Sequence, residues 1–300
     1  MRTSGRGPVF VTKASVRWTA GQRGRSGRAG RRSRRRGEAL LPNAGIRGEG
    51  PDRRATPRSR DTEADMLSTD EALLDNPVYA ALSGAHARFA QVRGRASRYP
   101  VDVAPFFALP SQPSAGDWQD AAGLVIPGTY AAVLHSGAEG PPGWKTIRAF
   151  DVVQMIGERV TGVDCPQAIS LGAADVPDML ELVAETEPGP FLNRTIELGD
   201  YLGLRCDGAL VAMAGERLRF DGWTEISGIC TMPTHRGHGL ASRLVDALIA
   251  GIELRSQRSF LHVLSANTSA IRLYEELGFR ARRSATITVM TPEPLRNTQK

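Results

Sequence analysis

The chain has 300 residues, of which 41% are hydrophobic and 23% are charged, and its formal net charge is +6. This length leaves room for one large domain or two small ones. No apolar run approaches the ~18 residues of a membrane span, and residues 9–11 are too short for a signal-peptide core. The composition therefore excludes a membrane protein and predicts a soluble, cytoplasmic one.

Three cysteines are present, Cys165, Cys206 and Cys230, and no C-x-x-C spacing joins any two of them. An odd and scattered set argues against both a disulfide framework and a zinc cluster. We therefore expect a reducing compartment and no bound metal.

The positive charge is concentrated in residues 1–65, which hold 17 of the 38 Lys and Arg residues but only 6 of the 32 Asp and Glu residues. The remaining chain has a net charge of −5. Residues 1–65 are rich in Arg, Gly, Ser and Pro and have almost no apolar periodicity, which predicts a disordered basic extension.

Three interpretations of this extension remain open. It has no role, for example because the start codon is placed too early and the protein begins at Met66. Alternatively it binds nucleic acid by counterion release at phosphates, which is the only route by which we expect nucleic acid as a partner. The third is an organelle-targeting peptide, against which the acidic residues Glu38, Glu49 and Asp52 weigh.

Residues 66–162 predict a smaller α/β half. Polar residues 68–71 are typical of a helix start, and a helix is expected to continue after Pro77 as far as Phe89. The two isolated histidines, His86 and His135, are interpreted as structural or surface residues. Strands are expected at residues 124–126, 130–134 and 152–156, separated by a loop at 137–143.

Residues 163–300 predict a second α/β domain, on a mixed sheet. The turns Asp207-Gly208 and Asp221-Gly222 lie between apolar runs, a strong hairpin signal that predicts a three-stranded antiparallel meander. The expected strands are residues 168–171, 201–206, 209–218, a central strand containing 225–231, 260–264 and a last one within 285–290; the expected helices are 176–185, a short piece at 195–198, 240–252 and 269–277.

The stretch from Glu225 to Ile249 predicts a strand, a turn that contains Gly237 and Gly239, and a long amphipathic helix. Two glycines at a helix start let a ligand approach the free N–H groups of the first turn. A helix N-terminus carries about +0.5 charge, so a phosphate is the preferred guest. The glycine order fits neither a P-loop nor a dinucleotide fingerprint.

Two stretches together resemble the paired signature of the GNAT acyltransferase superfamily. They are PTHRGHGLA at residues 233–241 and NTSAIRLYEELGF at residues 267–279. Within that superfamily the chain resembles the branch with the glycine N-acyltransferase-like C-terminal domain. The resemblance covers about residues 167–290 and implies a GNAT-like, mostly antiparallel sheet with flanking helices. In that branch the upstream half is often a degenerate copy of the same fold.

The resemblance implies acyl-CoA, with acetyl-CoA as the acyl donor. The pyrophosphate is expected on backbone amides and the pantetheine beside the central strand, where Gly228 is expected to host a bulge that opens the sheet. Thr234 and Ala241 depart from the usual family residues, but the backbone is expected to do the binding. The expected cofactor-binding residues are Ile229, Cys230, Thr231, Arg236, Gly237, His238, Gly239, Leu240, Ala241, Ser242 and Asn267.

Attack of an amine on a thioester needs a neutral nucleophile and a proton for the leaving thiolate. Glu225 is the candidate base, direct or through water, with a solvent-facing strand carboxylate as the alternative. Tyr274 occupies the position of the family's general acid, or packs in the core. Asn267 is also placed to cap the helix that follows it. Cys230 and His262 are interpreted as core residues rather than as a nucleophile and a second base.

These residues predict an acyl-CoA-dependent N-acyltransferase that transfers the acyl group to a small-molecule or peptide amine by direct attack in a ternary complex. The alternative is a non-catalytic acyl-CoA-binding module whose upstream half recognises a partner. Turnover over a panel of amines separates the two.

Overall fold

The structure is a computed structural model that describes residues 71–135 and 140–293. The basic extension at residues 1–65 and the side chain of His135 therefore lie outside the described residues. Within the described ranges, no helix is both long and apolar enough to cross a membrane.

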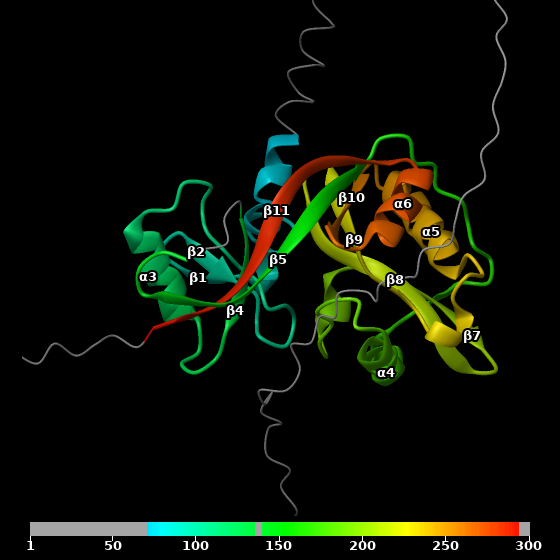
Figure 1. Ribbon diagram of the computed structural model, residues 1–300, viewed down its shortest axis with the longest axis horizontal. Helices are drawn as coiled ribbons and strands as arrows, with labels where there is room; N and C mark the ends of the chain where they lie inside the picture. The colour runs from blue at the N-terminus through cyan, green and yellow to red at the C-terminus, as the bar shows by residue number, and fades with distance from the viewer. Residues whose placement is uncertain (1–70, 136–139, 294–300) are drawn as a thin grey trace, which may run out of the picture.

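One eight-stranded sheet runs through most of the molecule (Figure 1). Its neighbouring strands are antiparallel except for β9 and β10, which are parallel. This confirms the predicted mixed, mostly antiparallel sheet. In spatial order the strands are β4 (Ala131–His135), β11 (Phe279–Pro292), β5 (Trp144–Gly157), β10 (Arg258–Leu264), β9 (Trp223–Thr231), β8 (Ala209–Phe220), β7 (Tyr201–Cys206) and β6 (Ile169–Ser170).

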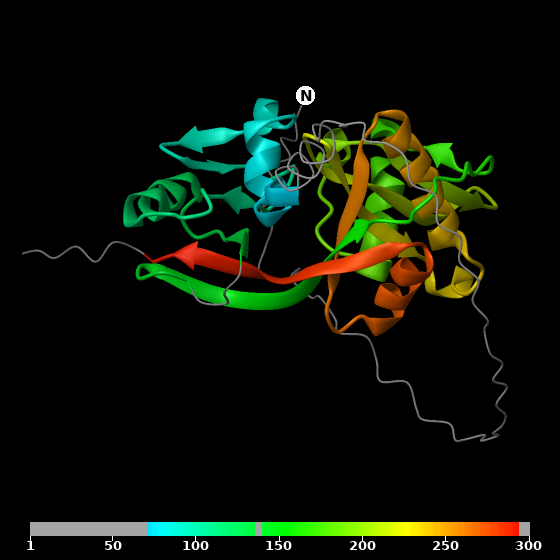
Figure 2. The ribbon, with the colours of Figure 1, turned by 90° about the horizontal axis from the view of Figure 1, so that it is seen from above.

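The long strands β5 and β11 pair along their whole length and carry the sheet from one side of the molecule to the other (Figures 1 and 2). β5 also pairs with β10, so it lies between two strands that follow it by about a hundred residues in the chain. The expected division between residues 162 and 163 therefore does not separate two sheets, because β4 and β5 precede it and pair with strands beyond it.

Helices cover both faces of the sheet in the C-terminal part. α5 (Leu240–Leu254) and α6 (Thr268–Glu276) pack in one apolar cluster with Ala212 and Ile226. α4 (Val176–Thr186) packs in another with Met213 and Cys230, from the same two strands. The predicted hairpin is confirmed: Asp207 and Gly208 have φ of 50° and 84°, as a tight turn between β7 and β8 requires. Short 3₁₀ helices connect these elements: η3 (Ala173–Asp175), η4 (Thr195–Leu198) and η5 (Pro233–His235).

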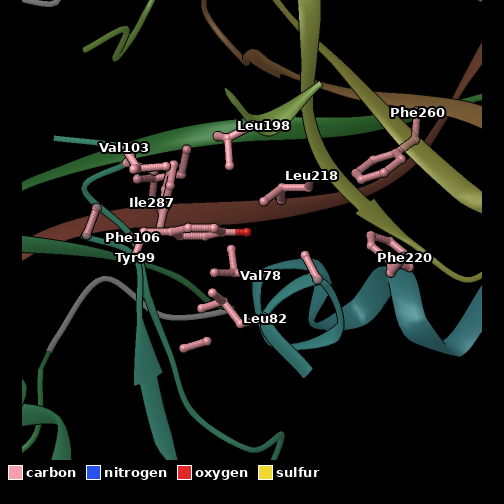
Figure 3. Packing of buried hydrophobic residues seen from close by; sticks show 14 of the residues in the cluster. Val78, Leu82, Tyr99, Val103, Phe106, Leu198, Leu218, Phe220, Phe260 and Ile287 are labelled. Atoms are coloured by element: carbon pink, nitrogen blue, oxygen red, sulfur yellow. The ribbon is translucent and has the colours of Figure 1, made fainter. Parts of the chain in front are cut away.

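Residues 71–130 form a smaller lobe, here called the N-terminal lobe. Its residues Val78 and Phe106 pack in one core with Leu218 and Phe260 of the C-terminal part, so the two parts share buried surface (Figure 3). The lobe comprises η1 (Leu73–Asp75), α2 (Pro77–Ser83), η2 (Ala87–Phe89), a small sheet of β1 (Gln91–Arg93), β2 (Ala96–Arg98) and β3 (Phe107–Ala108), and α3 (Ala115–Leu124).

Two predictions for this lobe were wrong. Residues 124–126 are not a strand: Leu124 ends α3, and Val125 caps it through N–H bonds to Ala121 and Ala122. Ser114 starts that helix in a capping box with Asp117, a signal strong enough to make the following apolar residues helical. The helix expected from Pro77 to Phe89 stops at Ser83, where Gly84 leaves the helical conformation.

Candidate active site

The junction of β9 and α5 forms a cradle for an anion. Gly237 and Gly239 adopt φ of 83° and 69°, which only glycine reaches without strain. Apart from the glycine and its two chain neighbours, no atom of the described residues lies within 4 Å of where a side chain would begin at either position, so the approach to the backbone is open. No side chain caps α5, and the N–H groups of its first turn have no partner inside the helix. The predicted strand, turn and helix are thus confirmed.

The side chains of the cradle do little to fill it. The Nε atom of Arg236 donates to the Thr231 carbonyl at 3.2 Å, and Nδ1 of His238 lies 3.2 Å from the His235 carbonyl. Both bonds fold the side chains back onto the turn. The backbone amides therefore remain the groups presented to a ligand, as the glycine pattern predicts.

The sheet opens directly before the cradle. β9 pairs with β10 only at Trp223, Thr224 and Glu225. Beyond them Gly228 has a φ of 63°, and the pairing with β8 shifts register between Ser227 and Cys230. Gly228 is thus at a β-bulge, as its position predicted, and the edge of β9 that faces β10 has unpaired peptide groups.

The opened edge and the cradle together fit an acyl-CoA. Unpaired strand amides suit the amide-containing pantetheine arm, and helix N–H groups suit its pyrophosphate. The hydroxyl of Thr231, between the two, is buried without a hydrogen-bond partner among the described residues, so it too has unused bonding capacity. Cofactor binding by these residues stays a prediction.

Glu225 lies on the same strand but is fully enclosed. Its two carboxylate oxygens accept bonds from Nη2 and Nε of Arg217, at 2.6 and 2.8 Å, and one of them also contacts Nδ1 of His262 at 2.7 Å. Burial acts to raise the pKa of Glu225, but Arg217 and His262 outweigh it and lower the pKa to about 2. This geometry does not favour direct proton transfer to the carboxylate, and it excludes the solvent-facing alternative.

His262 is held in one tautomer by Gln154. The Nε2 amide of Gln154 donates to the Leu74 carbonyl at 2.8 Å, and its oxygen accepts from Arg282 at 3.0 Å, so the amide cannot be reversed. That same amide nitrogen lies 3.2 Å from Nε2 of His262, which must therefore accept. The ring proton is on Nδ1 and is donated to Glu225.

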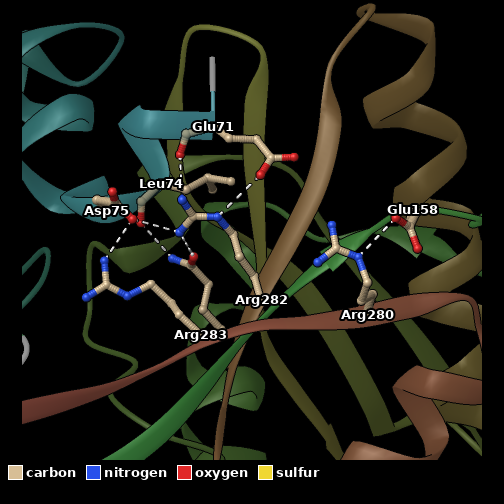
Figure 4. A network of polar contacts seen from close by, with 8 residues as sticks. Glu71, Leu74, Asp75, Glu158, Arg280, Arg282 and Arg283 are labelled. Atoms are coloured by element: carbon tan, nitrogen blue, oxygen red, sulfur yellow. Dashed lines mark hydrogen bonds and ion pairs between the residues drawn. The ribbon is translucent and has the colours of Figure 1, made fainter. Parts of the chain in front are cut away.

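Arg282 joins this array to the start of the N-terminal lobe (Figure 4). It donates to the Glu71 carbonyl at 2.9 Å and to Asp75 at 2.8 Å, and Arg283 reaches Asp75 as well. Both arginines point the same way because the register of β11 shifts between Ala281 and Arg283. A continuous polar chain thus runs from the lobe to Arg217, and no local sequence signal predicted it.

Tyr274 lies on α6, 8% exposed, with its ring edge-on to Phe279 at 6.1 Å. Its hydroxyl has no hydrogen-bond partner among the described residues, and burial raises its pKa to about 12. The hydroxyl therefore carries its proton at neutral pH, while the ring packs in the core. Asn267 caps α6, because its Oδ1 accepts from the Ala270 N–H at 3.2 Å.

The remaining candidates behave as structural residues. Cys230 is 7% exposed, and burial raises the pKa of its thiol to about 11, which makes it a poor nucleophile at neutral pH. His86 is buried with its Nδ1 2.8 Å from the Tyr99 hydroxyl. No group of metal-binding side chains occurs within residues 71–135 and 140–293.

Comparison with known proteins identifies the family of this chain. The family model described as FR47-like protein matches residues 201–288. A proposed acetyltransferase from the GNAT family of Novosphingobium aromaticivorans shares 38% identity over 74% of this chain and 99% of its own, with a TM-score of 0.68. A GCN5-related N-acetyltransferase from Kribbella flavida has the same fold, at 17% identity, 72% and 95% coverage and a TM-score of 0.50. No curated protein matches the sequence.

Proposed function

Since this chain belongs to the GNAT family of acetyltransferases, we propose that it is an N-acetyltransferase, which moves the acetyl group of acetyl-CoA to an amine by direct attack in a ternary complex. The observation that carries this proposal is the succession of two features in one stretch of chain: the bulge at Gly228 that opens the sheet, and the amide cradle at Gly237 and Gly239 directly after β9 and η5.

The backbone holds the cofactor in this proposal. The N–H groups of residues 237–242 bind the pyrophosphate, whereas that of Arg236 already donates to the Pro233 carbonyl at 3.4 Å. Residues 229–231 bind the pantetheine arm along the opened edge of β9. Acetyl-CoA supplies a thioester, whose carbonyl carbon is open to attack by an amine. Because backbone groups do the binding, the side chains of His238 and Ala241 have little influence on affinity. Asn267 lies at the start of α6 and provides a further contact to the cofactor.

Tyr274 is the general acid for the leaving thiolate. Its hydroxyl is protonated at neutral pH and has no competing partner among the described residues, so it is available to donate.

Glu225 is a positioning residue in this proposal rather than the base that takes the proton of the amine. Enclosed and bonded to Arg217 and His262, it stays ionised and fixes the position of the Arg217 guanidinium. The amine loses its proton to water that enters with the acceptor, because Glu225, with a pKa lowered to about 2, is too weak a base to take it.

The test is release of free CoA thiol from acetyl-CoA by the full chain, over a panel of amines. Acceptor-dependent release that falls by about 10²-fold or more in Tyr274→Phe is the result this mechanism predicts. Binding of acetyl-CoA without release over the whole panel would instead support a non-catalytic acyl-CoA-binding module.

A further inference from the structure

The ring of Tyr201 crosses two strands because two glycines leave it room. Tyr201 on β7 pairs with Gly215 on β8, and a side chain at Gly215 would begin 2.1 Å from the ring. At the bulge in β9, a side chain at Gly228 would begin 3.5 Å from Cε1 and 4.0 Å from the hydroxyl of Tyr201. Phe191 holds the ring edge-on at 5.4 Å. The hydroxyl of Tyr201 therefore lies at the point where the sheet opens.

This hydroxyl is unpaired, in contrast to that of the other fully buried tyrosine nearby. Tyr99 bonds to His86 at 2.8 Å, whereas Tyr201, 2% exposed, has no hydrogen-bond partner among the described residues. Burial raises the pKa of the Tyr201 hydroxyl, so it keeps its proton and offers a donor. The hydroxyl oxygen is not fully enclosed, so a ligand oxygen can reach it and accept its proton.

A second unused donor belongs to Arg217. Its Nε and Nη2 atoms bind Glu225, while Nη1 has no partner among the described residues. The guanidinium lies over the Phe106 ring at 5.2 Å, and 9% of the side chain remains accessible, against none of Glu225. Arg217 follows Gly215 by two residues on β8, and Gly215 pairs with Tyr201, so the side chains of Arg217 and Tyr201 lie on the same face of the sheet.

We propose that the Tyr201 hydroxyl and Nη1 of Arg217 bind the carboxylate of the acceptor, and that the acceptor is an amino acid, with its amine beside the carboxylate. The proposal rests on the acyltransferase function above. Both groups are donors, and a guanidinium forms its strongest hydrogen bonds with carboxylates. The amine then lies beside Gly228, at the open end of the β9 edge.

The charges of the site also favour this class of acceptor. Arg217 and Glu225 form a neutral pair, and His262 is neutral in the tautomer that Gln154 imposes. A zwitterion adds no net charge to this enclosed cluster, with its carboxylate toward Arg217 and its ammonium within the field of Glu225. A simple alkyl ammonium would add an uncompensated charge, at a desolvation cost.

The test compares matched acceptors: α-amino acids, their carboxamides, and the amines that lack the carboxylate. We expect kcat/KM of the full chain to be about tenfold or more higher for the amino acids than for either analogue, because the analogues offer the donors of Arg217 and Tyr201 no carboxylate to bind. In Tyr201→Phe, kcat/KM should fall about tenfold more for the amino acids than for the plain amines. Tyr99→Phe, which removes a paired hydroxyl, should lose stability but keep this selectivity.

Equal rates for all three classes would overturn the proposal, and a preference for the carboxamides would assign the donors to a peptide carbonyl instead. If no acceptor is acetylated, a binding measurement tests the carboxylate site independently of the transfer reaction. The same compounds are then titrated calorimetrically into the protein with CoA present. Carboxylate-dependent binding that weakens in Tyr201→Phe would support the carboxylate site even though the proposed transfer had failed. Binding without that dependence would reject the site.

Discussion

The guanidinium of Arg217 binds both carboxylate oxygens of Glu225, at 2.6 and 2.8 Å, in a space from which solvent is almost excluded. Removing one partner of such a pair leaves a buried charge without its counter-ion. We therefore expect Glu225→Gln to lower the free energy of unfolding by about 3–5 kcal/mol. The matched control is Glu197→Gln, whose partner Arg194 is 44% exposed and whose loss should cost under ~1 kcal/mol.

The same pair predicts a pH dependence. The pKa of Glu225 is about 2 in the folded protein and 4.5 as the ordinary value, so the unfolded chain binds a proton more readily. The contribution of Glu225 to stability is then complete above about pH 4.5 and is lost as the pH falls toward 2. Denaturant unfolding at several pH values measures this slope. An unchanged slope in Glu225→Gln would contradict the assignment.

Gly239, directly before α5, and Gly251, within it, should respond in opposite ways to replacement by alanine. Gly239 precedes the helix with a φ of 69°, so Gly239→Ala should cost about 1–2 kcal/mol of stability and turn the cradle amides away from the phosphate. Gly251 lies within the helix, with the nearest atom to a new side chain 3.9 Å away, so Gly251→Ala should gain about 0.5–1 kcal/mol. Thermal unfolding and acetyl-CoA titration measure both. Weakened acetyl-CoA binding in Gly251→Ala would argue against a specific effect.

Tyr274→Phe should separate chemistry from binding. The hydroxyl has no hydrogen bond to lose, so the free energy of unfolding should not fall. The acetyl-CoA dissociation constant should stay within about twofold, while kcat falls by about 10²-fold or more. Equal changes in kcat and in acetyl-CoA affinity would show that Tyr274 only packs against Phe279.

Arg282 and Arg280 lie two residues apart on β11 and should differ in their contribution to the free energy of unfolding (Figure 4). Arg282 is 15% exposed and binds Glu71, Asp75 and Gln154, so Arg282→Ala should cost about 1–3 kcal/mol. Arg280 pairs with Glu158 at the surface, both nearly half exposed, and Arg280→Ala should cost under ~1 kcal/mol. If chemical denaturation shows equal losses of unfolding free energy in the two variants, the polar chain through Arg282 does not stabilise the lobe.

The local elements of the C-terminal part were predictable because each has its own signal. Asp207-Gly208 specified a hairpin, Gly228 a bulge, and Asn267 a helix start, and all three are present. In the N-terminal lobe the apolar run at residues 124–126 predicts a strand, but the capping box at Ser114 starts a helix that ends in that run. A run of that length does not distinguish a helix end from a strand.

The long-range features were not predictable in this way. The insertion of β5 between β10 and β11 depends on pairing across about a hundred residues, which leaves no local trace. The burial of Glu225 was not predictable either, because its partners Arg217 and His262 lie on two other strands. Tyr201 did have a signal, the glycines opposite it at 215 and 228, but only the strand register reveals that they are opposite.

The most direct test of the central claim is calorimetric titration of the full chain with acetyl-CoA, beside Gly237→Glu and Gly239→Glu. A glutamate at either position places a negative charge before the amides that bind the pyrophosphate. Gly208→Glu is the matched control, since Gly208 has a φ of 84° and equally open space but lies in the β7–β8 turn. The account predicts saturable binding to the unaltered chain and to Gly208→Glu, and its loss in both cradle variants. Equal binding by all four proteins would contradict it.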